Sequence, residues 1–178
     1  MHKFSLFCMA VILMITTARA EEPEQPAHWI DRVPITITIR SGKAFSGGSS
    51  YYLLENVFRV GYNFNKRWSV YLPMTSSIAL FDREEGVKRY EDSNTIGLAM
   101  GYSPIHTSTD RLELVAQWDC SIQKDWRYRA YEFGMRYGDG HKNSGVLHYI
   151  EAGVRYFDTY RGAVPSNLTW YLGFGLRF

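Results

Sequence analysis

The last eleven residues of the chain, Leu168 to Phe178, form a strictly alternating segment that reads L-T-W-Y-L-G-F-G-L-R-F. Every second side chain is large and apolar, and those between them are small, polar or charged. Successive side chains of a β-strand point to opposite faces, so this pattern predicts a strand with one fully apolar face. Its length also matches what a tilted strand needs to cross a bilayer.

The same alternation recurs upstream, in segments separated by turns rich in Gly, Asn, Asp and Ser. No run of 18 or more apolar residues follows residue 20, so we expect no membrane-spanning helix. Regularly spaced strands with turn signals favour a closed all-β sheet. We therefore predict an all-β fold, an eight-stranded antiparallel up-and-down transmembrane β-barrel over residues 33–178. Its strands are expected at 33–40, 52–64, 68–80, 95–103, 112–120, 131–137, 146–156 and 168–178.

Residues 1–20 have the features of a cleaved secretory signal peptide. Lys3 precedes an apolar run over residues 6–15, and Ala18-Arg19-Ala20 is an A-x-A cleavage pattern. The alternative, a transmembrane anchor, requires a longer apolar run. Residues 21–32 are polar, with two prolines, and we interpret them as a short periplasmic leader.

Cleavage would remove Lys3 and Arg19, which leaves 18 basic against 18 acidic residues. This balance argues against a nucleic-acid partner. Cys120 would then be the only cysteine, so no intrachain disulfide can form, and we expect it to be a small lipid-facing residue.

The alternating pattern and the aromatic C-terminus resemble the small eight-stranded outer-membrane β-barrel proteins of Gram-negative bacteria. The resemblance covers the whole mature chain, and Trp170, Phe174 and Phe178 carry its C-terminal strand signature. It implies location in the bacterial outer membrane after export, and contact with outer-membrane lipid and lipopolysaccharide. It also implies recognition of the C-terminal strand by the barrel-assembly machinery.

Alternation alone does not separate a membrane barrel from a soluble lipocalin-like one, because the two exchange inside for outside. All five lysines after residue 20 fall in predicted loops or turns, whereas a water-facing strand surface would carry several. Aromatic residues gather near the strand ends of the apolar face, as in an interfacial girdle. We therefore expect the polar rows to line the lumen, with a charge network of Arg40, Glu55, Arg59, Glu113, Asp119, Glu132, Arg136, Glu151, Arg155 and Arg177.

An even strand number puts both ends of the barrel on the periplasmic side. Residues 63–67, 104–110 and 138–145 are then periplasmic turns, and the opposite segments 41–50, 82–94, 123–129 and 158–167, which are longer on average, are extracellular loops. In these loops Trp126, Tyr128, Tyr160 and Arg161 are the candidates for contact with a surface ligand.

The chain offers no catalytic, cofactor-binding or metal site that we can name, and we expect none. The string His106-Thr107-Ser108-Thr109 differs from the His-x-Ser-Asn motif of lipid A deacylases and falls in a periplasmic turn. We interpret His148 as an interfacial residue. The prediction is a non-enzymatic outer-membrane barrel with a structural or surface-interaction role through its extracellular loops. Two alternatives stay open: a lipid A-modifying enzyme of the deacylase or acyltransferase class, and a soluble periplasmic lipocalin-like binder of apolar ligands.

Overall fold

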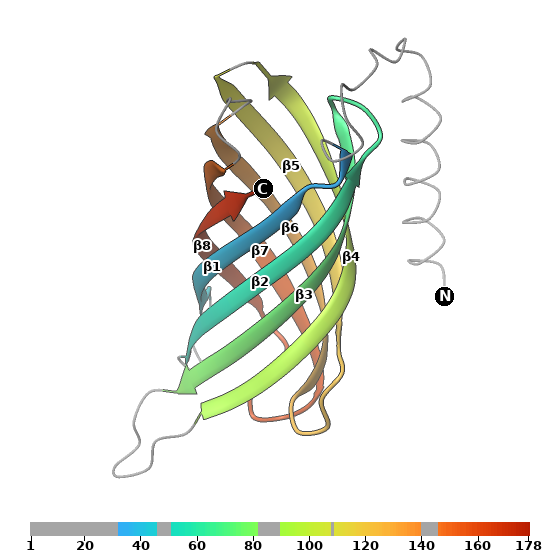
Figure 1. Ribbon diagram of the computed structural model, residues 1–178. Coiled ribbons are helices and arrows are strands. Elements are labelled where there is room, and N and C mark those ends of the chain that lie inside the picture. Colours follow the sequence, from blue (N-terminus) through green and yellow to red (C-terminus); the bar gives the residue numbers. More distant parts are fainter. Residues whose placement is uncertain (1–31, 46–50, 82–89, 108, 140–145) are drawn as a thin grey trace.

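The computed structural model describes residues 32–45, 51–81, 90–107, 109–139 and 146–178 (Figure 1). The predicted signal peptide, and the predicted leader up to residue 31, lie outside these ranges. The described chain forms one closed, eight-stranded antiparallel barrel in which each strand pairs with its neighbours in sequence, as predicted. The strands are β1 (Ile35–Ala44), β2 (Tyr51–Asn63), β3 (Trp68–Phe81), β4 (Tyr90–His106), β5 (Asp110–Ser121), β6 (Arg127–Asp139), β7 (Leu147–Arg161) and β8 (Leu168–Arg177).

The ring closes between the first strand and the last. β1 pairs with β8 from Thr36↔Arg177 to Ala44↔Thr169. Beyond this ladder, Ile35 and Phe178 exchange backbone hydrogen bonds of 3.3 and 2.9 Å. We call this end of the barrel the terminal end and the opposite end, which carries residues 122–126 and 162–167, the loop end. Figure 1 shows the terminal end at the top and the loop end at the bottom.

The predicted division into an outward apolar row and an inward polar row is confirmed. On β1 the burial alternates residue by residue: Ile39 is 66% exposed, whereas Thr38 is 0% and Arg40 is 1% exposed. On β8, Leu172 and Phe174 are exposed and Tyr171 is buried. The pleat therefore gives each strand an outward row that is mostly large and apolar, while the charged and small side chains, with some buried aromatic ones, point into the barrel.

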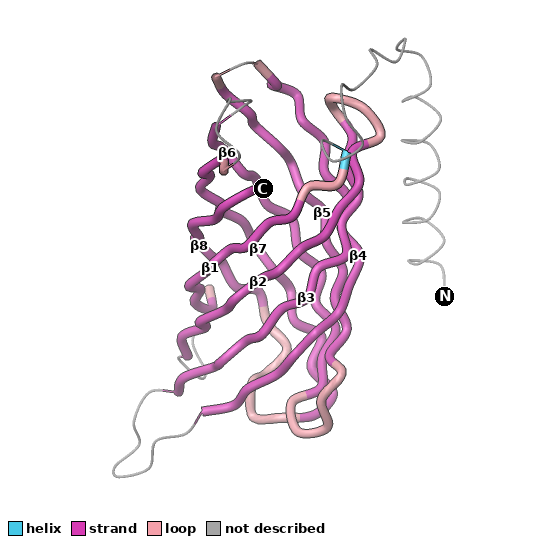
Figure 2. The backbone as a smooth tube through the Cα atoms, in the orientation of Figure 1, coloured by secondary structure: helices cyan, strands magenta, loops and turns pink. Residues whose placement is uncertain are grey.

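Several strands are longer than predicted, mostly at the loop end. β1 continues to Ala44 and includes Lys43, β4 begins at Tyr90 inside the predicted loop 82–94, and β7 continues to Arg161. Figure 2 shows these extensions as continuous strand. Backbone hydrogen bonds between strands do not require alternating apolar side chains. The strands therefore extend beyond the alternating segments from which we predicted their ends. Among the described residues no helix is long and apolar enough to cross a membrane.

The loop end of the lumen is filled by an aromatic plug, and this corrects one prediction. Trp126 and Tyr128, expected to be available for a surface ligand, point inward and are 0% and 1% exposed. Their rings lie 4.7 Å apart, and the Tyr128 ring lies 4.9 Å from that of Phe157. Because both residues continue the inward row of β6, alternation buries them. Tyr160 and Arg161 are exposed. The plug consists of Tyr51, Leu53, Ala79, Trp126, Tyr128, Ala130, Phe157 and Val164.

Candidate functional site: the lumen charge network

The strand register sets arginines directly opposite glutamates inside the lumen. Arg40 pairs with Glu55, and Glu132 pairs with Arg155. Arg136 has a glutamate on each side, because its partner is Glu113 on β5 and Glu151 on β7. Opposite charges in cross-strand positions stabilise a sheet. The network therefore follows from the register that the turns and the apolar face impose.

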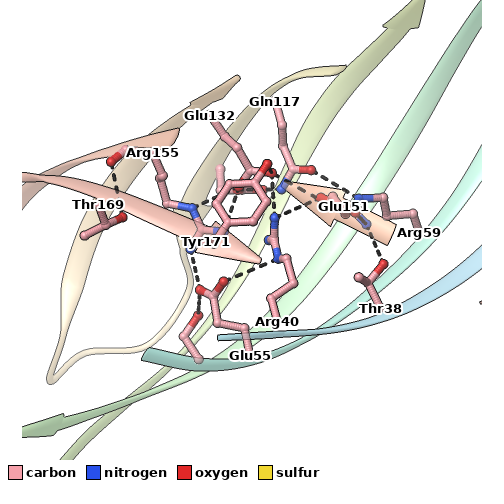
Figure 3. Close-up of polar contacts among 12 residues, drawn as sticks. Thr38, Arg40, Glu55, Arg59, Gln117, Glu132, Glu151, Arg155, Thr169 and Tyr171 are labelled. Carbon is pink, nitrogen blue, oxygen red and sulfur yellow. Dashed lines mark hydrogen bonds and ion pairs between the residues drawn. The ribbon is translucent and has the colours of Figure 1, made fainter. Parts of the chain in front are cut away.

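Glu132 is one hub of the network, and Figure 3 draws its contacts. Its Oε1 accepts a hydrogen bond of 2.6 Å from Nη1 of Arg40 and one of 3.0 Å from the Tyr171 hydroxyl. Its Oε2 accepts from Nε and Nη2 of Arg155, at 2.9 and 2.7 Å. The carboxylate side chain is 0% exposed. Four donors thus occupy both oxygens, which is the condition for a charge to lie stably in a dry interior.

Glu151 is the second hub and joins three arginines. It accepts from Nη2 of Arg59 at 3.0 Å, from Nη1 of Arg40 at 3.2 Å and from Nε of Arg136 at 3.1 Å. The Arg59 guanidinium donates further to Oγ1 of Thr38 at 3.0 Å. Because Arg40 contacts both Glu132 and Glu151, the two hubs form one continuous network.

Glu113 and Glu55 extend the network towards the two ends of the barrel. Glu113 accepts from Arg111 at 3.1 Å, from Arg136 at 3.3 Å and from the Tyr71 hydroxyl at 2.7 Å. Glu55 accepts from the hydroxyl of Ser77 at 2.7 Å and also pairs with Arg155 and Arg40.

Two predicted members lie at the edge of this network. Asp119 is buried but has no arginine within 4.0 Å among the described residues; its Oδ2 accepts a 2.7 Å bond from the Gln117 side chain, and its Oδ1 has no partner. Arg177 is half-buried at the terminal end and donates to Asn63 at 3.3 Å.

Glycines on the polar rows make room for the largest side chains of the lumen. Gly134 and Gly153 face the Tyr171 side chain, and a Cβ at Gly153 would lie 2.6 Å from Cζ of its ring. Any larger residue at these two positions would displace the hydroxyl that donates to Glu132. The small residues are therefore part of the geometry of the network.

Sequence reasoning missed several polar members of the lumen. Arg111 falls between the predicted turn 104–110 and the predicted strand 112–120, and Tyr71, Gln117, Tyr149 and Tyr171 are not among the charges predicted for the lumen. Four of the five share the alternating row of a predicted charge on their own strand: positions 111 and 117, for example, have the parity of Glu113. Tyr71 lies in the buried row of β3 with Ser69 and Ser77, a row that contains no charged residue. Parity with a predicted charge was the signal that could have found the other four.

The lumen is filled rather than open over the described residues. A cavity near the terminal end has a volume of about 20 Å³, enough for about one water molecule. Arg111, Glu113, Arg136 and Arg177 are among the residues that line it. At the loop end the aromatic plug closes the interior.

The described residues that were considered as catalytic candidates, His106, Thr107 and His148, make hydrogen bonds to nearby backbone and side-chain groups. Nδ1 of His106 lies 2.7 Å from the backbone oxygen of Lys66, and Thr107 bonds within its own turn to Asp110. Ser108 lies outside the described residues. His148 contacts Asp139 at 3.3 Å. In the described ranges no group of three or more His, Cys, Asp or Glu side chains is arranged to hold a metal ion.

These features define the chain as a closed eight-stranded barrel with an ionic lumen and an apolar exterior. In comparisons with protein-family models, curated proteins and solved structures, nothing matched the chain.

Proposed function

We propose that the chain is a bacterial outer-membrane β-barrel protein with a structural or surface-interaction role and no catalytic activity. The observation that carries the proposal is the inverted polarity of the barrel. Charged side chains such as Arg155 and Glu132 are buried, whereas large apolar residues such as Ile39, Leu172 and Phe133 are among the most exposed. In water this arrangement would expose a continuous apolar surface, far beyond the patches that soluble monomers tolerate.

The height of the apolar band supports a bilayer as the surrounding solvent. Tyr52 and Tyr62 lie on the outer face near the two ends of β2, ten positions apart. At about 3.3 Å per residue and a tilt of about 40°, these aromatic residues are separated by about 25 Å along the barrel axis. This is the height expected of the apolar band between two aromatic girdles.

The same polarity argues against the soluble alternative. A lipocalin-like binder of apolar ligands needs an apolar cavity, but the described interior carries arginine–glutamate pairs and a plug of packed rings.

The enzymatic alternative has no comparable support. Lipid A chemistry towards the outer leaflet needs its reactive groups near the loop end. His106 and His148 lie near the terminal end, at the last residue of β4 and near the start of β7.

The proposed partners follow from a barrel whose apolar outer face contacts lipid. Outer-membrane lipid, including lipopolysaccharide, would cover the outer face. The C-terminal strand, with Trp170, Phe174 and Phe178 exposed, would be recognised by the barrel-assembly machinery. A signal peptide over residues 1–20 would direct export.

Fractionation of the expressing bacterium, combined with gel migration of boiled and unboiled samples, tests the proposal. We expect the protein in the outer-membrane fraction, extracted only by detergent and migrating faster before boiling. Recovery from the soluble periplasmic fraction would refute the proposal. A mass spectrum of lipid A from cells with and without the gene tests the absence of catalysis. An acyl-chain difference would instead support the lipid A-modifying enzyme.

A further inference from the structure

Three arginines lie together on the outer face of the barrel, at its loop end. Arg127 and Arg129 are at the start of β6, and Arg161 is the last residue of β7. All three are exposed, whereas Trp126 and Tyr128, on either side of Arg127, are buried in the plug. The alternation of the strand therefore turns these arginines outward, away from the lumen charge network.

The register places two of these cations directly against each other. Arg127 is the cross-strand partner of Arg161. The next pair inward joins Tyr128 to Thr159, so Tyr160 is the extra residue of a bulge, and the Arg129 guanidinium lies 5.8 Å from its ring centre. Like charges opposite each other destabilise a sheet. An anion between them would remove that cost.

No acidic side chain of the described residues forms an ion pair with this cluster. None lies within 4.0 Å of a nitrogen atom of Arg127, Arg129 or Arg161. Asp158 is the register partner of Arg129 on the same face but makes no such ion pair. Glu91, also near the loop end, uses both carboxylate oxygens to accept from the backbone N–H of Ala163 at 2.8 and 2.9 Å.

The position of the cluster along the barrel axis, relative to the apolar band, indicates which kind of anion it would bind. Trp118, Tyr131 and Tyr156 form one cross-strand row on the outer face of β5, β6 and β7. Arg129 lies two residues beyond Tyr131 on the loop side, or about 7 Å along the strand. Tyr and Trp side chains mark the headgroup level of a membrane. The arginines therefore lie where lipid headgroups would end the apolar band.

We propose that Arg127, Arg129 and Arg161 form a binding site for the phosphate groups of a phosphorylated glycolipid in the outer leaflet. The guanidinium group offers paired N–H donors that match phosphate oxygens, and the exposed Tyr160 ring adds a flat surface beside them. This inference rests on the proposed function, because it requires the loop end to face the outer leaflet.

The test compares lipid binding by the folded, detergent-purified full-length mature chain and two variants, measured by native mass spectrometry. The ligands are bis-phosphorylated lipid A and the same lipid with its phosphates removed. The test variant is Arg127→Gln/Arg161→Gln. The control variant, Lys66→Gln/Arg67→Gln, also removes two adjacent exposed cations but at the terminal end. All three proteins must show heat-modifiable migration before binding is measured.

We expect the unaltered chain to bind the phosphorylated lipid about tenfold more tightly than the dephosphorylated one. The Arg127→Gln/Arg161→Gln variant should lose that preference, and the control variant should keep it. Equal binding of both lipids by the unaltered chain, or the same loss in both variants, would overturn the inference. Inorganic phosphate that displaces the lipid at equal concentration would also overturn it, because the site would then select free phosphate.

Failure of this inference and failure of the proposed function give different results. A chain recovered from the soluble fraction without detergent overturns both. A chain that inserts into membranes, migrates as a folded barrel and shows no preference for phosphorylated lipid overturns the lipid site alone.

Discussion

Replacement of Glu132 by glutamine tests whether the ionic lumen holds the barrel together. Glutamine keeps the shape of the side chain but removes its charge. In the native chain four donors, from Arg40, Arg155 and Tyr171, converge on this fully buried carboxylate. The variant would leave two buried guanidinium groups without their shared anion, and the amide group would present a donor where an acceptor is needed.

The expected cost is large because, over the residues that the structure describes, each arginine would keep only the carboxylates that it already contacts. Arg40 would retain Glu151 at 3.2 Å and Glu55 at 3.4 Å, and Arg155 would retain Glu55. Removing one partner of a buried ion pair typically costs about 3–5 kcal/mol. We therefore expect Glu132→Gln to lower the free energy of unfolding by about 3 kcal/mol or more.

Urea unfolding in detergent or lipid, followed by tryptophan fluorescence and by gel migration, measures this loss. The control is Asp125→Asn, an exposed acid in the connection between β5 and β6, where we expect a change within about 0.5 kcal/mol. A loss below about 1 kcal/mol for Glu132→Gln would refute the reasoning, because it would mean that water screens the lumen as it screens a surface pair.

Three further changes probe the other parts of the barrel. Asp119→Asn removes a buried carboxylate that has no arginine within 4.0 Å in the described part of the chain, so we expect unchanged or increased stability, by up to about 1 kcal/mol in the same urea assay; clear destabilisation would contradict this. Trp126→Ala leaves a cavity in the aromatic plug and should lower the free energy of unfolding by about 3–5 kcal/mol; an unchanged free energy of unfolding would mean that the packing of this ring does not stabilise the barrel. Leu172→Arg puts a charge on the apolar band and should weaken folding into lipid by about 2–4 kcal/mol, while Asp125→Arg in the loop should not; equal effects would argue against a lipid-facing β8.

The architecture could be predicted from the sequence because alternation reports directly on which face of a strand is apolar. Turns rich in Gly, Asn and Asp separated the segments, and the count of eight followed. The strand ends could not be fixed in the same way. Lys43 and Tyr90 continue their strands through backbone pairing beyond the alternating segments, and the pattern of apolar side chains does not report such bonds.

The lumen was predictable as a set of charges but not as a network. Which arginine contacts which glutamate depends on the strand register and on closure of the barrel. Across the closed lumen, Arg40 on β1 lies 2.6 Å from Glu132 on β6, although these two strands are not neighbours in the sheet. The aromatic plug was missed for a different reason. Trp126 and Tyr128 stand in a charged segment that we interpreted as a loop, although their parity matches Ala130 and Glu132, which point inward.

The seam between β1 and β8 has a consequence for how this ring can be built. Because Ile35 and Phe178 already meet through their backbones, the first and last strands are neighbours like any other pair. A short linker joining these two residues, with new termini opened between Gly162 and Asn167, would interrupt no strand ladder. The circular order of the strands, rather than the point at which the polypeptide starts, defines this barrel.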